Sequence, residues 1–265
     1  RQLGFTRFTE NLRLLQLTWA GADKYTRMEN LPRSVVLANA SGAFGTIIAE
    51  YAIGSLVALY RSFGRYWSNK QAHIWQKYDH AETISGKTAL VLGMGDIGAN
   101  VARRLKVFGA AVLGVKRTAV SAVPADFDEA HTLDALDALL PRADIVIGCL
   151  PNTRETAGLL TAERLHAMKA GAVLVNVGRG SLAGTDDLVS TLQDGHLGGA
   201  ALDVFETEPL PADCPLWDME NVLLTPHIAG PSFGGSADVQ NTIWHICMDN
   251  LERYLTGNPL KNVVN

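Results

Sequence analysis

The sequence has few cysteines, little net charge and no long uninterrupted apolar run. Its three cysteines (Cys149, Cys214 and Cys247) show no paired spacing, which argues against a disulfide framework and suits a reducing cytoplasm. A formal net charge of −4 gives no electrostatic basis for binding nucleic acid or an acidic membrane. The apolar run Phe44–Leu59 is interrupted by Glu50, Tyr51 and two glycines, which predicts a buried helix rather than a membrane span.

The chain also lacks an initiator methionine and a visible signal peptide. It begins at Arg1, from which we expect the natural protein to start earlier. Its 265 residues, 47% of them hydrophobic, are enough for two domains or one large α/β unit. We place the protein in the cytoplasm.

From Thr88 onward, short runs rich in β-branched and apolar residues alternate with amphipathic stretches. The runs predict buried parallel strands at Thr88–Leu92, Ala111–Val115, Asp144–Cys149, Ala172–Val177, Gly199–Val204 and Val222–Thr225. The stretches between them predict helices at Ile97–Phe108, Leu133–Leu140, Ala162–Lys169 and Asp186–Asp194. This repeated order of strand, helix and strand predicts an α/β domain with a doubly wound parallel sheet, the Rossmann arrangement.

The segments on either side of this sheet have apolar patterns of their own. Two further strands are predicted at Leu12–Thr18 and Val35–Asn39, followed by a long apolar helix over about Gly45–Ser62. Helical spacing of apolar residues returns near the C-terminus and stops at Gly257. We therefore expect residues 1–43 and 236–265 to form a smaller discontinuous domain, and residues 44–235 to form the larger one.

The segment Tyr66–His80 places Trp67, Ile74, Trp75 and Tyr78 among polar residues, which fits neither a buried helix nor a buried strand. Two interpretations remain open. The segment could be a loop packed on its own domain, or an arm that buries its aromatic side chains on a partner subunit. The second interpretation predicts a homodimer.

A glycine motif follows the first strand of the sheet. The letters LVLGMGDIG, which end at Gly98, place GxGxxG between a strand and the start of a helix. Gly93 permits the tight turn, Gly95 lets the backbone approach a pyrophosphate, and Gly98 lets the helix pack on the strand. The motif alone could be a structural turn. Its context, with a helix N-terminus that favours phosphates and a second strand ending at Val115, predicts a dinucleotide site.

The end of that second strand lacks the acid that holds the ribose of NAD. Lys116, Arg117 and Thr118 stand close to where an NAD site places its carboxylate. A cation pair cannot accept a hydrogen bond from the ribose 2′-hydroxyl, but it can pair with a 2′-phosphate, with Arg117 as a bidentate fork. The alternative is a solvated basic turn, which is common at strand ends. The pattern favours NADP over NAD.

Three polar residues follow at the ends of successive predicted strands, where open α/β sheets place their sites. Arg179 stands in NVGRG, Glu208 in DVFETEP and His227 in TPHIAG. Taken singly, they could be a surface turn residue, a solvated loop acid and a satisfied histidine behind a strand. Together, on glycine- or proline-bounded loops at one sheet edge, they combine an anion binder, an acid/base and its orienting group, which predicts an active site.

These motifs together resemble those of the D-isomer-specific 2-hydroxyacid dehydrogenases, in the order GMGDIG, NVGRGSL, ALDVFETEPL and LLTPHIAG. The resemblance covers nearly the whole chain, from the loop Trp19–Asp23 to the final helix. It implies a Rossmann coenzyme domain, a smaller flavodoxin-like substrate domain, and an enzyme that reduces a small 2-keto acid to the D-2-hydroxy acid or catalyses the reverse. The cations at 116–118 are similar to those of the glyoxylate/hydroxypyruvate reductases that use NADPH.

The resemblance also implies roles for the site residues. Arg179 should hold the substrate carboxylate and polarise its 2-keto oxygen, and His227 should donate a proton to that oxygen while NADPH delivers hydride to C2. Glu208 should hydrogen-bond His227, orient the ring and favour its protonated form. Asp203 should hydrogen-bond the nicotinamide amide.

Further residues are assigned to the walls of the site by the same resemblance. The amides of Ala20 and Gly21 should bind the substrate carboxylate, and Trp19 should either shape the pocket or fill the core of the small domain. The residues expected to line the cofactor are Gly93, Gly95, Asp96, Ile97, Gly98, Lys116, Arg117, Thr118, Cys149, Leu150, Pro151, Thr156, Val177, Gly178, Asp203 and Gly230. Cys149 should be a wall residue and not a nucleophile, because no partner motif accompanies it. The remaining histidines lack metal-ligand spacing, so no metal is expected.

Two departures from the family pattern and two rival interpretations remain. Members usually have several tens of residues before the loop Ala20–Asp23, so we expect the substrate domain to be incomplete at its N-terminus. The second departure is the cation pair, which replaces the acid of the NAD-using branch.

One branch of the family serves as dinucleotide-sensing transcriptional corepressors, but this sequence has no extended disordered tail and no basic patch for nuclear partners. A related NAD-dependent hydrolase or formate-oxidising branch would need other pocket residues, and the cation pair argues against it.

Overall fold

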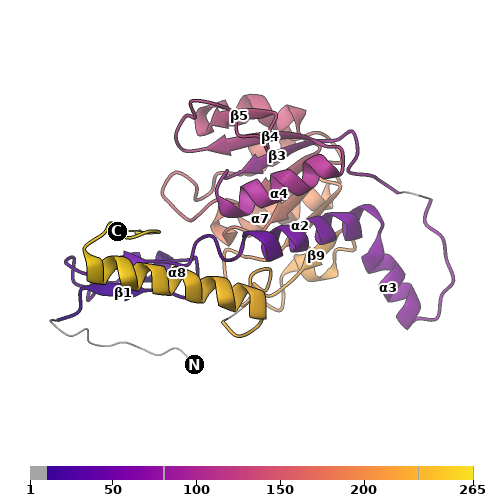
Figure 1. The fold of residues 1–265 in the computed structure, drawn as a ribbon. Helices are drawn as coiled ribbons and strands as arrows, with labels where there is room; N and C mark the ends of the chain where they lie inside the picture. The colour runs from indigo at the N-terminus through magenta and orange to yellow at the C-terminus, as the bar shows by residue number, and fades with distance from the viewer. Residues whose placement is uncertain (1–10, 80, 232, 265) are drawn as a thin grey trace. The chain divides into compact units, whose positions relative to one another are not determined.

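The computed structural model describes residues 11–79, 81–231 and 233–264 of the chain. They form two compact units, each described by itself below (Figure 1). The smaller unit runs to Phe44 and resumes at Pro231, and the larger unit comprises Gly45–Gly230. The chain therefore leaves the small unit once and returns to it. The return comes at Pro231, a few residues before the boundary at residue 236 that the sequence predicts.

The described part of the larger unit contains one sheet of seven parallel strands, in the order β5-β4-β3-β6-β7-β8-β9. Their bounds are β3 (Thr88–Leu92), β4 (Ala111–Lys116), β5 (Glu129–Thr132), β6 (Ile145–Gly148), β7 (Val173–Asn176), β8 (Gly199–Leu202) and β9 (Val222–Leu224). The strand order reverses between β3 and β6, which is the switch point of a doubly wound sheet. The predicted Rossmann arrangement is confirmed.

The inner strands are apolar on both faces because helices cover both faces. Every residue of β6, β7 and β8 is buried, as the continuous apolar runs in the sequence predict. The edge strand β5, with the sequence EAHT, is missed by the sequence patterns. It is only half-buried, and its Glu129 pairs with Arg142 at 2.5 Å, so neither apolar alternation nor a buried run marks it.

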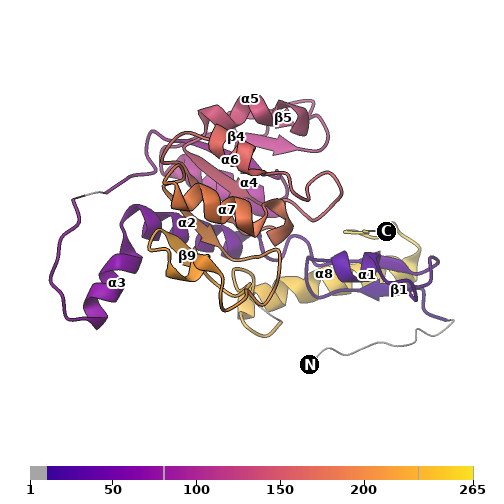
Figure 2. The same cartoon turned by 180° about the vertical axis from the view of Figure 1, so that it is seen from behind.

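Helices lie on the two faces of the sheet. Figure 1 shows α2 and α4 in front of it, and the reverse view in Figure 2 shows α5, α6 and α7. The bounds are α2 (Gly45–Tyr60), α4 (Asp96–Val107), α5 (Leu136–Leu139), α6 (Ala162–Ala167) and α7 (Thr185–Gln193). The helix expected over Leu133–Leu140 is instead α5 between two 3-10 turns, Leu133–Ala135 and Leu140–Arg142. Among the described residues, no helix is both long and apolar enough to cross a bilayer.

The smaller unit combines a short sheet with one long helix. Strands β1 (Leu14–Gln16) and β2 (Val36–Ala38) pair in parallel, α1 (Asp23–Thr26) lies between them in the chain, and α8 (Ala237–Thr256) follows the larger unit. The side chain of Asn250, on α8, is fully buried. Its Nδ2 donates to Gln16 Oε1 at 2.7 Å and its Oδ1 accepts from Lys261 N at 2.8 Å, so one amide joins α8 to the sheet and to the C-terminal segment.

The aromatic segment after α2 begins as a helix, α3 (Phe63–Gln71), which the sequence patterns miss. Helix α3 and the chain after it extend away from the sheet of their own unit (Figures 1 and 2). Trp67 is 62% exposed and Trp75 is 98% exposed, so the interpretation as a loop packed on its own domain is wrong for these two side chains. His80, the last residue of the predicted segment, lies outside the described residues.

Two glycines at the start of α4, the N-cap Gly95 and Gly98 in its first turn, give a matched test of packing. A Cβ atom on Gly98 would lie 1.7 Å from the carbonyl oxygen of Gly93, whereas one on Gly95 would meet no heavy atom within 4 Å. Gly98→Ala should therefore lower the free energy of unfolding by about 3 kcal/mol or more, because backbone must move to admit the methyl group. Gly95→Ala should lower it by less than about 1 kcal/mol, the usual cost at a helix N-cap. Urea unfolding of the cofactor-free protein measures both, and equal losses would contradict this packing argument.

Candidate active site

Three loops leave the same edge of the sheet next to one another. Strands β7, β8 and β9 are neighbours and parallel, so their carboxyl ends share one edge. Arg179 follows β7, Glu208 follows β8 and His227 follows β9. The fold therefore brings the three predicted catalytic residues to one edge, which is where open α/β sheets bind their ligands.

The His227 ring is held through its Nδ1 atom. Glu208 Oε2 lies 2.9 Å from His227 Nδ1, and Glu208 Oε1 accepts a hydrogen bond from Phe205 N at 3.1 Å. Because an ionised carboxylate only accepts hydrogen bonds, Nδ1 carries the proton of this contact, which leaves Nε2 to exchange a proton with a ligand. The hydrogen bond that the resemblance implies between these residues is present. The side chains are 50% and 37% exposed, so the pair is open to solvent.

The neighbouring acid, Glu206, takes no part in this contact. Its Oε2 accepts a hydrogen bond from Thr185 N at 3.3 Å, at the start of α7. Both acids lie in the motif FETEP, and the structure directs only Glu208 to the histidine.

The backbone of His227 has a left-handed conformation, with φ = 58°. This conformation costs a residue with a Cβ atom about 1–2 kcal/mol. Two hydrogen bonds offset the cost, because His227 N donates to the carbonyl oxygens of Asp203 at 2.8 Å and Thr225 at 3.0 Å. The local chain is thus held in a turn that places the ring at the sheet edge.

Arg179 is carried by a loop that Asn176 shapes. Asn176 is 2% exposed; its Nδ2 donates to the carbonyl oxygen of Arg179 at 3.0 Å and its Oδ1 accepts from Gly178 N at 3.2 Å. The guanidinium donates back to the carbonyl oxygen of Gly178 at 2.7 Å. Sequence reasoning did not single out Asn176, although it opens the motif NVGRG, because a buried amide at a strand end gives no separate signal.

The glycine turn provides space for a phosphate group. Gly93 has φ = 107°, which favours glycine, and Gly95 is the exposed N-cap of α4 with open space where a Cβ atom would be. The packing of the protein therefore gives no reason for a glycine at 95, whereas the approach of a ligand does. The first amides of α4, at Asp96 and Ile97, face the same ligand position by their place in the helix. A dinucleotide pyrophosphate fits this turn.

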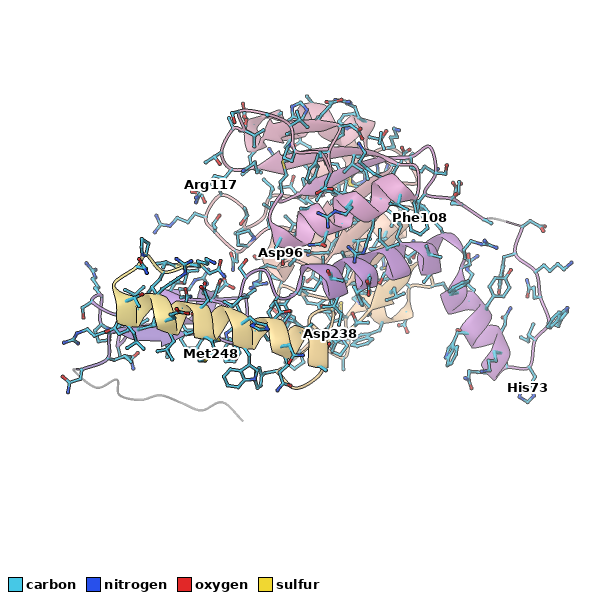
Figure 3. All side chains as sticks on the ribbon, viewed as in Figure 1. His73, Asp96, Phe108, Arg117, Asp238 and Met248 are labelled. Carbon is cyan, nitrogen blue, oxygen red and sulfur yellow. The ribbon has the colours of Figure 1, made fainter. Side chains whose placement is uncertain are left out.

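The predicted 2′-phosphate site lies after β4. Lys116 ends that strand and is half-buried, whereas Arg117 and Thr118 are exposed on the following loop. Figure 3 labels Arg117 on this loop and Asp96 at the start of α4. A hydrogen bond from Thr153 lowers the pKa of Glu155, and the charges of Arg117 and Arg154 lower it further. Arg117 therefore lies within electrostatic range of the loop that follows β6.

Tight backbone contacts form the wall predicted between the phosphate turn and Arg179. A Cβ atom on Gly93 would lie 2.9 Å from the carbonyl oxygen of Cys149, and one on Gly178 would lie 2.8 Å from that of Leu150. The loop after β6 is thus packed between the glycine turn and the Arg179 loop. Burial raises the pKa of the Cys149 thiol to about 12, so the thiol stays neutral, as expected of a wall residue.

The remaining predicted wall residues differ in environment. Leu150 and Val177 are buried, Pro151 is exposed, and Gly230 ends the larger unit. Thr156 is buried, and its hydroxyl donates to the carbonyl oxygen of Pro151 at 2.5 Å and accepts from Thr153 N at 2.8 Å. Thr156 therefore shapes its own loop, and cofactor contact at these positions stays a prediction.

The predicted substrate loop lies in the smaller unit. Trp19 is 47% exposed and its ring centroid lies 6.2 Å from that of Tyr25, so the alternative that it fills the core of the small domain is wrong. The carbonyl oxygen of Ala20 accepts a hydrogen bond from Asn39 Nδ2 at 2.6 Å, which fixes the loop before Gly21. Contact of this loop with a substrate carboxylate stays a prediction. In the described ranges, no three His, Cys, Asp or Glu side chains are grouped so as to hold a metal ion.

The chain is similar to characterised proteins over nearly its full length. Residues 53–229 match the family model for the NAD binding domain of D-isomer specific 2-hydroxyacid dehydrogenases. Over 263 residues the chain is 32% identical to the glyoxylate reductase of Thermofilum pendens, covering 96% of this chain and 75% of that one. A crystal structure of a D-isomer specific 2-hydroxyacid dehydrogenase family protein from Aeromonas salmonicida superimposes with a TM-score of 0.84 at 38% identity, covering 96% of this chain and 79% of that one.

A second solved structure carries a ligand. It is the NADPH-dependent glyoxylate/hydroxypyruvate reductase of Sinorhizobium meliloti, in complex with NADP and sulfate. Its TM-score is 0.83 at 31% identity, and the match covers 96% of this chain and 79% of that one. Sequence, sheet topology and the match over residues 53–229 agree, and the chain belongs to the D-isomer-specific 2-hydroxyacid dehydrogenase family of NAD(P)-dependent oxidoreductases.

Proposed function

We propose that the protein reduces a small 2-keto acid to the D-2-hydroxy acid, with NADPH preferred over NADH, and that it catalyses the reverse reaction. The observation that carries the proposal is the His227–Glu208 hydrogen bond at the sheet edge that also carries Arg179. Glyoxylate and hydroxypyruvate, which appear in the names of two relatives, define the class of substrate. All three cysteines are free, which suits the reducing cytoplasm in which we place the protein.

Arg179, His227 and Glu208 have separate roles in the reduction. NADPH, when bound, supplies the hydride for C2 of the keto acid. Arg179 pairs with the substrate carboxylate and polarises the keto oxygen, and His227 gives the proton on Nε2 to that oxygen as negative charge develops. Glu208 holds Nδ1 at 2.9 Å, so the ring keeps one orientation through the proton transfer. A guanidinium and an imidazolium beside the developing charge stabilise the transition state more than the ground state.

The cofactor is held by the larger unit. The Gly93–Gly98 turn and the N-terminus of α4 take the pyrophosphate, and Lys116, Arg117 and Thr118 take the 2′-phosphate. Asp203 would accept a hydrogen bond from the nicotinamide amide. Its Oδ2 accepts a hydrogen bond from Ala229 N at 2.9 Å, and a carboxylate oxygen can accept a second.

The acid pair gives the first prediction on activity. The protein should consume NADPH with glyoxylate, hydroxypyruvate, pyruvate or a longer 2-keto acid. His227→Ala should lower turnover by about two to four orders of magnitude, the usual contribution of a positioned acid, and leave NADPH binding nearly unchanged. Glu208→Gln should also lower turnover, because an amide does not require the proton to stay on Nδ1 and therefore holds the ring in one orientation less strictly.

Glu206→Gln is the matched control for the loss of turnover in Glu208→Gln. It changes the same kind of side chain two residues away, but that side chain contacts the start of α7 and not the histidine. Its turnover should equal that of the unmutated protein at a saturating 2-keto acid, once chemistry has been shown to limit turnover. A Glu208→Gln variant that also keeps its turnover would separate Glu208 from the proton donor and contradict the assignment.

The cation pair gives a prediction on cofactor choice. Arg117→Ala should weaken the binding of NADPH and leave the binding of NADH nearly unchanged, because the lost contact is to the 2′-phosphate alone. Arg117 is exposed, so the loss should lie near the lower end for a charged hydrogen bond, about 1.5 kcal/mol or roughly tenfold in Michaelis constant. Arg103 is an exposed arginine of α4 that pairs with Asp126, so Arg103→Ala should leave the Michaelis constants of both cofactors unchanged. Equal Michaelis constants for the two cofactors in the unmutated protein would overturn the NADP preference.

We also propose a homodimer in which the segment from α3 to residue 79 embraces a second copy of the chain. The support is the exposure of Phe63, Trp67, Ile74 and Trp75 on a segment that extends from its own unit. Sedimentation at micromolar concentration should give a dimer, and the double variant Trp67→Ala/Trp75→Ala should shift it toward the monomer, since buried aromatics dominate interface energies. Trp217 lies outside this segment and is 54% exposed, so Trp217→Ala should leave the dimer intact. A monomeric unmutated protein would refute the proposal.

A further inference from the structure

A chain of hydrogen bonds runs behind the His227 loop, through two hydroxyls that the proposed reaction does not use. Tyr51, on α2, places its hydroxyl 2.5 Å from Thr225 Oγ1. Thr225 follows β9, and its hydroxyl donates to Asp203 Oδ1 at 2.6 Å. Asp203 is 1% exposed, so the chain ends on a buried carboxylate. Helix α2 and the ends of β8 and β9 are thus linked through three side chains.

The chemistry of the groups fixes the direction of the chain. A carboxylate only accepts hydrogen bonds, so the single hydroxyl proton of Thr225 points to Asp203. Tyr51 must then be the donor to Thr225. Burial raises the pKa of the Tyr51 phenol, which keeps it protonated and able to donate. Donors aligned in one direction polarise one another, so the inner bond is strengthened by the outer one.

Asp203, at the end of the chain, holds the backbone at the proposed proton donor and after it. Asp203 Oδ1 accepts from Ile228 N at 2.8 Å, and Oδ2 accepts from Ala229 N at 2.9 Å. The carbonyl oxygen of Asp203 accepts from His227 N at 2.8 Å. One buried residue therefore fixes the left-handed turn at His227, whereas the half-exposed ring itself is held by Glu208.

We propose that Tyr51 and Thr225 are positioning residues for proton transfer by His227. Their hydroxyls hold the Asp203 carboxylate in the one orientation that binds the amides after His227, and so place the ring for reaction. The proposal rests on the proposed function, in which His227 is the proton donor. It goes beyond that function because it assigns roles to a residue on α2 and to a threonine, neither of which the proposed reaction uses.

Thr225→Val tests the inner hydroxyl, because valine keeps the shape of threonine and removes the donor. The substrate is whichever of hydroxypyruvate and glyoxylate the unmutated protein reduces faster with NADPH. The rate constant of a single turnover is measured for Thr225→Val in the presence of His227 and in the His227→Ala background. With His227 present the rate constant should fall by roughly tenfold to a hundredfold, the effect of a small misplacement of a reacting group. In the His227→Ala background the same change should have no further effect, because residues that act as a unit are not additive.

Two further variants keep the test decisive. Thr225→Ser restores the hydroxyl and should recover most of the rate, and Tyr51→Phe should cause a smaller loss that also vanishes in the His227→Ala background. Tyr51→Phe replaces Thr225→Val in the cycle if the valine variant fails to show a cooperative thermal transition. Equal losses with and without His227, or no loss for either variant, would overturn the proposal. Failure of the proposed function is distinct, since His227→Ala by itself would then keep its rate.

Discussion

The parallel pairing of β7, β8 and β9 is the constraint on which the site depends. Because neighbouring parallel strands end at one edge, residues far apart in sequence, Arg179 and His227 among them, leave the sheet at the same edge. No long-range side-chain contact is needed to bring these loops together. The hydrogen bonds of the sheet do so, and the buried apolar runs that form the strands therefore determine where the chemistry can occur.

Close backbone contacts then limit how far the loops can move. Gly180 lies against the backbone of Phe205, where a Cβ atom would come within 1.9 Å of the carbonyl carbon, and Gly178 lies against Leu150 in the same way. Loops that touch through backbone atoms have no side chain between them that could change rotamer. This explains how exposed residues such as Glu208 and His227 keep a defined geometry on loops, which are otherwise the mobile part of an α/β fold.

The sequence predicted the parts of the structure whose signal is local. Buried strands such as Val173–Asn176 were found because continuous apolar runs mark them, and the motifs of the proposed site were found because each is short and bounded by glycine or proline. Strand Glu129–Thr132 was missed because an edge strand can be polar, and helix Phe63–Gln71 was missed because it buries no residue of its own. Tyr51 was read as a polar interruption of an apolar helix. Its contact with Thr225 joins residues far apart in the chain, which no local pattern can show.

The exposure of the acid pair indicates what its hydrogen bond contributes. At 50% and 37% exposure, the attraction between His227 and Glu208 is largely screened by water and adds little to the stability of the fold. Its contribution is orientation, because it fixes which ring nitrogen faces a ligand. The buried interactions around Asp203 therefore hold the turn of the backbone, and the exposed pair sets the orientation of the ring.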